Sequence, residues 1–420
     1  MTLEIATSES FDHKVRRALR EIKLRERSKK RQLTDDLPIL KKILTTFQPI
    51  NSIKEDFLVG GIDGSGVPPL LRYDDIMIHI ITANLAVYNT SPRTDQIMKH
   101  VPLTGSSTIP ERGQLIEAFW ISMEDSLTWK YIEEFIRQIY MVKDVNELLF
   151  SFFSDVTGAQ VSSLRDIAKL GLRIDSLEQI ATLPPASDIR HIHDLMRTIT
   201  EFALAKRAIE SNLSLKYLFM DTSLTLLIPK GRKYSRLIDD YLKRDLCMRA
   251  RKRDIILLWV SKTHTIPCAS SISDLAEKEF GKDALWFCRI TGDEDPEGRL
   301  SILHDRHYVP PVAAVTYIFR FSRDSPIFRL DLDRNWWKEN IYNAKNTSMK
   351  ENERKLFGEI EYISRDARWF GYPVPLSFAH INCRVSREEA ALMIERAISI
   401  AKEEGFDDEK LIDPRSRIGL

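Results

Sequence analysis

The apolar positions along this chain predict strands and helices that alternate through most of its length. Two apolar runs near the start, at 57–63 and 70–88, flank a Gly-rich stretch and predict neighbouring antiparallel strands joined by tight turns. Later apolar runs predict two core strands and one hairpin, at 215–228, at 253–263, and at 313–321 with 327–332.

Apolar residues spaced by three or four positions predict helices between these strands. The segment 371–380 is predicted to be a loop, and 151–188 a small helical insertion that ends at the breaker LPPAS. The expected fold class is therefore α/β, with a mixed central sheet flanked by helices. The predicted helices span 11–48, 108–150, 188–212, 232–252 and 349–369, and a last one starts at Ser386.

The same pattern divides the chain into three parts. Residues 1–50 form an amphipathic, basic N-terminal helix, 51–400 form one α/β domain with a helical insertion at about 105–188, and 401–420 form a C-terminal tail. The apolar positions near the end of the first helix make it a candidate contact element for a partner. These positions are Leu37, Leu40, Ile43 and Leu44.

Composition narrows the class of protein. The chain has 420 residues, of which 43% are hydrophobic and 29% charged, as in ordinary globular proteins. No apolar run approaches the roughly 18 residues that span a bilayer, and the N-terminus lacks an apolar signal core, so neither a membrane protein nor export is expected. The cysteines form no C-x-x-C pair, which argues against a disulfide scaffold or zinc knuckle and favours the cytoplasm. They are Cys247, Cys268, Cys288 and Cys383.

Charge is segregated although the net charge is only +1. The stretch from Lys14 to Arg31 contains ten basic and two acidic side chains, and the stretch from Lys230 to Arg253 contains ten basic and three acidic ones. Such blocks can neutralise the phosphates of a nucleic acid, but a solvated helix face has the same composition. Both interpretations stay open at this point.

Two aspartates are placed where chemistry is expected. Asp63 follows the apolar run LVGGI at the tip of the first predicted strand, and Asp221 lies inside the apolar run 215–228. A buried carboxylate needs a cation or a proton, so two of them on adjacent strands, with a third from a helix, predict an oxygen site for Mg²⁺ or Mn²⁺. For Asp63 alone, a turn residue is the competing interpretation.

Three further residues could assist such a site. Lys262 ends the third core strand, where it could contact a phosphate. His380 lies eight residues after Tyr372 in GYPVPLSFAH, and a histidine can bind metal or move a proton. The Gly-rich segment GIDGSG lacks the spacing of nucleotide-binding loops.

The order of these motifs resembles the NurA family of nucleases. The resemblance rests on D-G-S at 63–65, D-x-S-L at 221–224, V-S-K at 260–262 and G-Y-P-x-x-L-x-x-A-H at 371–380, and extends over roughly residues 55 to 400. It implies an RNase H-like core, a homodimer, a need for manganese or magnesium, and a partnership with the HerA-type hexameric DNA-translocating ATPase.

The resemblance also assigns roles to residues. It implies that Asp63, Asp221 and a helical glutamate hold the metal, with Glu201 preferred to Glu210 as that glutamate. His380 would complete the metal site or relay a proton, Tyr372 would orient it or the phosphate, and Lys262 would match the family's lysine. Thr222 departs from the family pattern, which has glycine there.

The expected function is thus a metal-dependent deoxyribonuclease of the cytoplasm, acting on single- and double-stranded DNA. It would act with the ATPase in DNA end processing or defence, as an exonuclease and in addition as an endonuclease. A non-catalytic DNA-binding adaptor subunit of such an ATPase complex is the alternative, and Thr222 is the residue that keeps it open.

Overall fold

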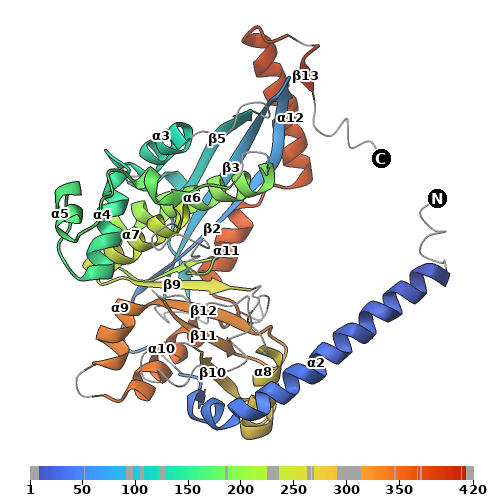
Figure 1. The fold of residues 1–420 in the computed structure, drawn as a ribbon, viewed down its shortest axis with the longest axis vertical. Helices are drawn as coiled ribbons and strands as arrows, with labels where there is room; N and C mark the ends of the chain where they lie inside the picture. Colours follow the sequence, from blue (N-terminus) through green and yellow to red (C-terminus); the bar gives the residue numbers. More distant parts are fainter. Residues whose placement is uncertain are drawn as a thin grey trace.

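The computed structural model describes residues 9–51, 53–90, 98–104, 108–122, 129–184, 188–224, 236–262, 266, 269–290, 314–344, 347–366, 368, 371–407 and 409–412. Within these residues, one large mixed sheet carries helices on both faces (Figure 1). Its order is β1-β10-β11-β12-β9-β7-β2-β3-β4, and β13 also pairs with β2 and β5 with β3. The strands are β1 Leu44–Phe47, β2 Leu58–Tyr73, β3 Ile76–Asn89, β4 Lys99–His100, β5 Gln114–Ser122, β7 Leu215–Met220, β9 Ile256–Ser261, β10 Leu285–Arg289, β11 Ala314–Arg320, β12 Phe328–Asp333 and β13 Leu411–Ile412.

The strands that carry the candidate residues form a recognisable core. β5, β3 and β2 are an antiparallel meander, and β7 and then β9 continue the sheet parallel to β2. Helix α6 (Ile189–Glu210) precedes β7, and α7 (Ile238–Lys252) connects β7 to β9. The order β5-β3-β2-β7-β9 is that of the RNase H-like core that the resemblance implies, and the α/β class is confirmed.

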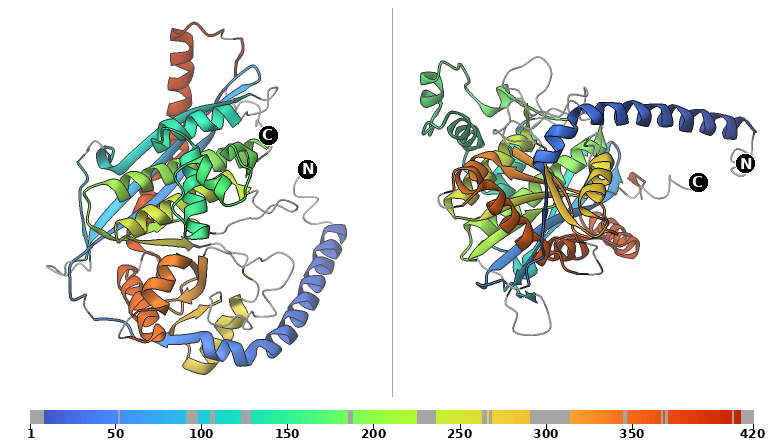
Figure 2. Two further views of the ribbon diagram at one scale, coloured as in Figure 1. Left: turned by 60° about the vertical axis from the view of Figure 1, so that its left-hand side comes forward. Right: turned by 90° about the horizontal axis from the view of Figure 1, so that it is seen from below.

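Side chains of each central strand alternate between two hydrophobic layers. In β7, Leu218 and Met220 pack with α6 and α7, whereas Tyr217 and Phe219 pack on the other face. Helices α10 (Met349–Ile363) and α11 (Val374–Cys383) cover that other face, as the two views of Figure 2 show. The remaining helices are α2 Glu9–Ile43, α3 Trp129–Tyr140, α4 Asn146–Thr157, α5 Leu164–Lys169, α8 Ala269–Phe280, α9 Arg334–Trp337 and α12 Arg387–Glu403.

The predicted helix at 108–150 is wrong over its first third. Residues 114–122 form β5, which pairs antiparallel with β3 along nine positions. Leu115, Phe119 and Ile121 are buried while Ile116 and Trp120 are exposed, which is the alternation of a strand. The spacing of four between the apolar residues imitated a helix. Helices of the predicted insertion therefore begin only after β5, and they are α3, α4 and α5.

The N-terminal helix is present but ends earlier than predicted. α2 stops at Ile43, and residues 44–47 turn into β1, which pairs with β10. Leu40 and Leu44 are buried with Trp286 and Ile272, so these positions serve the chain's own core. Upstream of them, α2 extends away from the body of the molecule (Figure 1).

Other segments confirm or extend the prediction. The hairpin of β11 and β12, the helices α6 and α10, and the last helix with Ser386 as its N-cap are confirmed. The predicted helix at 232–252 begins at Ile238 among the described residues, and 225–228 of the predicted strand lie outside them. Sequence patterns missed α8, β10 and the short β13 in the predicted tail.

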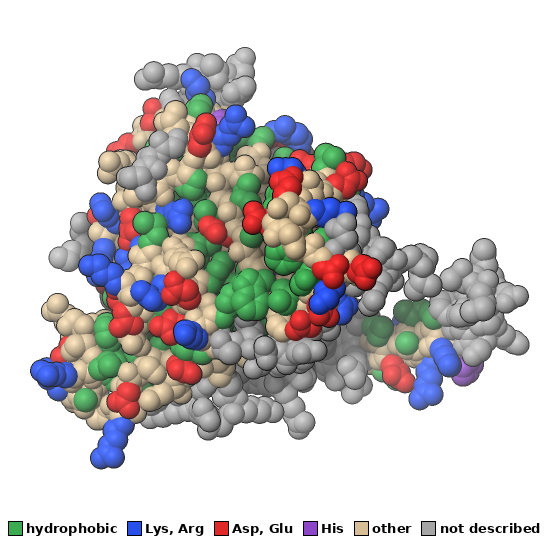
Figure 3. All heavy atoms as spheres, turned by 90° about the horizontal axis from the view of Figure 1, so that it is seen from above, with side chains coloured by type: hydrophobic (Ala, Val, Ile, Leu, Met, Phe, Trp, Pro, Cys, Tyr) green, Lys and Arg blue, Asp and Glu red, His purple; other side chains and the backbone are tan. Residues whose placement is uncertain are grey.

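No helix in the described part of the chain is long and apolar enough to cross a membrane. The face seen from above carries Lys and Arg side chains mixed with Asp and Glu around a central apolar area (Figure 3). Charges of the two signs are therefore interspersed on that face.

Candidate metal centre

Asp63 lies in the middle of a strand rather than at its tip. β2 continues through the Gly-rich stretch to Tyr73, and Asp63 pairs with Asn84 of β3. This corrects the predicted turn, because the backbone of residues 58–67 pairs without interruption with β3. The neighbouring Ile62 pairs with Met220, the last residue of β7. Asp63 therefore sits beside the carboxyl end of the parallel strand β7.

Asp221 follows β7 directly, instead of lying inside the strand as predicted. Its backbone N–H donates to the carbonyl oxygen of Ile62 at 3.4 Å, which ties it to β2. The backbone at Thr222 does not take a left-handed conformation, so the threonine is accommodated without the freedom of a glycine. The departure at Thr222 thus leaves the local backbone unstrained.

Asp63, Asp221 and His380 come together in one group. Each offers a ligand atom, and these atoms lie within 4.8 Å of one another. Nδ1 of His380 is 2.6 Å from Oδ2 of Asp63, and the N–H of Gly64 donates to Oδ1 of Asp63 at 2.8 Å. Two carboxylates and one imidazole are a donor set that suits Mn²⁺ and also Mg²⁺.

His380 reaches this group from a helix, not from a loop as predicted. α11 packs closely on β2 because Gly61 has no side chain: a Cβ there would lie 2.4 Å from the backbone nitrogen of Leu376. At the far end of α11, Thr82 of β3 donates from its hydroxyl to the carbonyl oxygen of Cys383 at 2.6 Å. These contacts fix the helix on the sheet and so place His380.

Lys262 and Tyr372 lie next to Asp221. Nζ of Lys262 is 3.3 Å from Oδ2 of Asp221 and 4.1 Å from the centre of the Tyr372 ring. The buried Tyr372 hydroxyl is near enough to Asp221 to affect its pKa, without a hydrogen bond of standard geometry. A cavity of about 230 Å³ opens here. It is lined by Lys262, Pro326, Phe328, Arg368, Tyr372, Ser377 and His380.

Glu201 lies next to the group but outside its set of close ligand atoms. Its side chain is 2% exposed, and Nη1 of Arg197 lies 2.8 Å from its Oε1. Glu210, the alternative glutamate, instead pairs with Lys206 and Arg249. Of the two glutamates, the structure therefore brings only Glu201 near Asp63 and Asp221.

Burial dominates the electrostatics of the site. It raises the pKa of Glu201 to about 8, with Asp63 and Asp221 adding to the effect and Arg197 opposing it. Burial, followed by the charge of Asp63, also raises the pKa of Asp221, while Lys262 lowers it. The ionised carboxylates thus lack full compensation by the chain's own cations, which is the condition for binding a metal ion.

Three supporting residues were missed by sequence reasoning. Asp331 of β12 is fully buried and accepts a hydrogen bond from the N–H of Leu224 at 2.9 Å, holding the loop that follows Asp221. Arg329 donates from Nε to Asp331 at 2.9 Å. Arg197 was missed as well, although its spacing of four from Glu201 on a helix is a sign of an ion pair.

Most of the described basic side chains in the second predicted basic block form ion pairs with carboxylates of the same chain. Its described basic residues on α7 include four that form ion pairs with carboxylates, so this block is not a free basic face. They are Lys243 with Asp239, Arg244 with Asp155 and Asp333, Arg249 with Glu210 and Asp245, and Arg251 with Asp155 and Asp333. Residues 230–235 lie outside the described part, as do the side chains of 25–31 in the first block.

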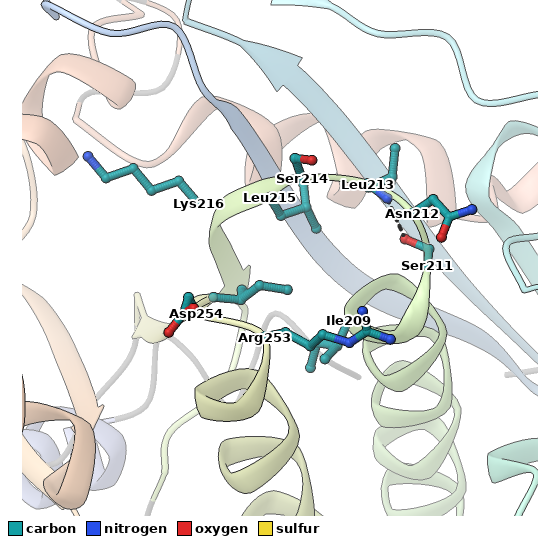
Figure 4. A pocket seen from close by; sticks show the side chains of 10 residues that line it. Ile209, Ser211, Asn212, Leu213, Ser214, Leu215, Lys216, Arg253 and Asp254 are labelled. Atoms are coloured by element: carbon teal, nitrogen blue, oxygen red, sulfur yellow. Dashed lines mark hydrogen bonds between the residues drawn. The ribbon is translucent and has the colours of Figure 1, made fainter.

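A second hollow lies at the amino-terminal ends of the parallel strands, whereas the candidate metal centre lies at their carboxyl ends (Figure 4). It has a volume of about 470 Å³ and lies where β7 and β9 begin, between the ends of α6 and α7. Lys216, Arg253 and Asp254 supply its charges. Ligands of parallel sheets bind at the carboxyl ends of the strands, so this hollow is not part of the candidate metal centre.

No family model and no curated protein matches the chain. The structure of the NurA nuclease from Sulfolobus solfataricus aligns with 95% of this chain and with 98% of its own chain. The sequence identity is 14% and the TM-score is 0.44. A structure of NurA bound to dAMP and manganese matches 94% over 97%, at 13% identity and a TM-score of 0.36. Endonuclease V from Ciona intestinalis with an inosine-containing DNA matches 86% over 97%, at 11% identity and a TM-score of 0.26. Over nearly its whole length, this chain is similar to structures of NurA nucleases, the family that its motif order resembles.

Proposed function

We propose that this chain is a divalent-metal-dependent deoxyribonuclease that hydrolyses phosphodiester bonds. The observation that carries the proposal is the group of Asp63, Asp221 and His380 at the carboxyl end of β7, because its buried carboxylates need a cation. Mn²⁺ or Mg²⁺ bound there would polarise the phosphate and make a hydroxide available at neutral pH.

The residues around the cavity would bind and orient the substrate. Lys262, next to Asp221 and over the Tyr372 ring, would contact a phosphate placed against the carboxylates. Arg368, which pairs with Asp366, lines the same cavity, and Phe328 offers an apolar wall to a sugar or base. Phosphate and stacking contacts do not read base edges, so cleavage without sequence preference is expected.

The proposed partners are DNA, a second copy of the chain and a HerA-type hexameric ATPase, in DNA end processing or defence in the cytoplasm. The predicted contacts Leu40 and Leu44 are buried in the chain's own core. The candidate contact surface is instead the exposed part of α2, where Leu19 and Ile22 are 58% and 54% exposed among arginines. Deleting residues 9–24 should weaken DNA binding, ATPase binding or both, and unchanged binding of both would exclude this role.

One assay tests the activity. End-labelled single- and double-stranded DNA is incubated with the protein and Mn²⁺, Mg²⁺ or EDTA, and cleavage is expected with either metal and not with EDTA. Asp63→Asn and Asp221→Asn should be inactive, and Asp274→Asn, an exposed aspartate of α8, should cleave normally. Metal-independent cleavage would contradict the proposal. Metal and DNA binding without any cleavage would favour the adaptor alternative.

A further inference from the structure

Arg197 lies among the carboxylates of the metal centre. It is one turn before Glu201 on α6, and its Nη1 contacts Oε1 of Glu201 and also donates to the carbonyl oxygen of Gly64 at 3.3 Å. Glu201 raises the pKa of Arg197 most, and Asp194, Asp63 and Asp221 raise it further. The guanidinium thus supplies positive charge to several acidic groups at once.

Glu201 is held on the α6 side of β2. A Cβ at Gly64 would lie 2.5 Å from Oε1 of Glu201, so the glycine leaves room for this carboxylate. Adjacent residues of a strand point to opposite faces, and Asp63 is on the side where His380 of α11 contacts it. The centre therefore has two halves: Asp63, Asp221 and His380 form one, and Glu201 with Arg197 forms the other.

We propose that the guanidinium of Arg197 takes the place of a second divalent ion, so that each chain binds a single Mn²⁺ or Mg²⁺ through Asp63, Asp221 and His380. In two-metal sites the ions lie about 3.5–4 Å apart and share carboxylates. Here the carboxylate available for a second ion is that of Glu201, and Arg197 already occupies its Oε1.

The chemistry of arginine fits this role. A guanidinium is always charged and its planar fork matches carboxylate and phosphate oxygens, so it can balance Glu201 and still donate to a phosphate. The side chain of Arg197 is 31% exposed, which leaves it accessible from the solvent. This inference rests on the proposed function, since both concern the same site.

Metal stoichiometry tests the inference without relying on cleavage. Isothermal titration of the EDTA-treated full chain with Mn²⁺ should give one ion per chain for the wild type and for Arg197→Lys. Arg197→Gln should give two, because Glu201 becomes free to bind, and Arg197→Gln with Glu201→Gln should return to one. Arg190→Gln, an exposed arginine in the first turn of the same helix, is the matched control and should stay at one.

Each outcome decides a separate question. Two ions in the wild type would overturn the inference and leave the proposed nuclease intact, whereas no Mn²⁺ bound by the wild type would contradict the proposed function. One ion in a folded Arg197→Gln would also overturn the inference. Thermal unfolding checks the fold, and Mn²⁺ should raise the melting temperature of Arg197→Gln more than that of the wild type. If that variant does not fold, the wild-type and Arg197→Lys counts still decide.

Discussion

Two groups of buried carboxylates among the described residues differ in charge balance. Between α4, α7 and the end of β12, Asp155 and Asp333 are each 4% exposed, and Arg244 and Arg251 each pair with both of them. At the metal centre, three carboxylates face Arg197 and the partly exposed Lys262. The first group has equal numbers of opposite charges, and the second has an excess of negative charge.

The comparison shows that burial alone does not identify a functional acid. A balanced group fixes helices to the sheet, because removing either partner leaves an uncompensated charge in the interior. An unbalanced group opposes folding by repulsion until a cation arrives. Burial and neighbouring carboxylates raise the pKa of Glu201 and Asp221, as this repulsion requires. The predictions below test the contrast, from the largest expected effect to the smallest.

The first prediction concerns the unbalanced group. Asp63→Asn and Asp221→Asn should each lower the rate of DNA cleavage by about 10³-fold or more, because each removes one of the proposed metal ligands. In EDTA, Asp221→Asn should melt at the same or a higher temperature than the wild type, since repulsion with Asp63 is relieved. Cleavage assays and thermal unfolding with and without Mn²⁺ measure both effects. Cleavage at the wild-type rate by either variant would contradict the assignment of that aspartate as a metal ligand.

The balanced group should show the reverse pattern. Asp333→Ala leaves Arg244, whose side chain is 1% exposed, without half of its compensation, so unfolding should become easier by about 3–5 kcal/mol. The folded fraction should still bind Mn²⁺ with unchanged affinity. Denaturant unfolding and Mn²⁺ titration at low temperature measure the two quantities. A loss of metal affinity with unchanged stability would abolish the distinction between the groups.

Much of the fold was predictable because its central strands are strongly apolar. Continuous apolar runs predict strands at β7, at β9 and in the hairpin of β11 with β12. β5 was mistaken for a helix because its apolar residues also recur at a spacing of four, and only pairing with β3 decides between the two. The Gly-rich part of β2 was mistaken for a turn because its glycines serve helix contacts at Gly61 and Gly64, which are properties of the tertiary structure.

The site was predictable as far as single residues carry a signal. A carboxylate in an apolar run marks Asp63 and Asp221 as unusual, and the motif order adds Tyr372 and His380. Charge balance could not be predicted, because it depends on which cations the fold brings close. The basic block on α7 illustrates the limit: its composition suited a phosphate-binding surface or a solvated helix face, and several of its arginines instead neutralise buried aspartates.

The pH dependence of stability should also distinguish the two groups of carboxylates, by a smaller change in the free energy of unfolding. The pKa of Glu201 is raised by burial from an ordinary 4.5 to about 8, so the folded state holds its proton more tightly than the unfolded state. In metal-free protein this contribution to stability is complete below about pH 4.5 and is lost as the pH rises toward 8. Glu201→Gln should remove this decline, which amounts to a few kcal/mol. Equal pH profiles for the two proteins, measured by denaturant unfolding in EDTA, would contradict the raised pKa.

His380 should contribute to metal binding by a moderate amount. With Nδ1 at 2.6 Å from Asp63 and within the ligand group, His380→Ala should weaken Mn²⁺ binding by about 10–100-fold, and excess Mn²⁺ should restore part of the activity. If His380 is instead a general acid or base, turnover should fall while metal affinity stays constant. His100→Ala, at an exposed histidine of β4, is the control and should change neither quantity.

The smallest effect is expected for Tyr372→Phe, which removes one hydroxyl and keeps the ring under Lys262. The hydroxyl lies near Asp221 and lowers the pKa of that carboxyl, which burial otherwise raises. Its loss should raise the pKa of Asp221 further, so the acid limb of the activity profile should move to higher pH and the rate near neutrality should fall several-fold. Stability should hardly change, because the buried hydroxyl makes no hydrogen bond of standard geometry. Tyr217→Phe is the matched control: its hydroxyl bonds Glu359 at 2.6 Å, away from the site, so stability should fall and the activity profile should stay in place. An unshifted acid limb in Tyr372→Phe would reduce Tyr372 to a packing residue and leave Lys262 as the group that modulates Asp221.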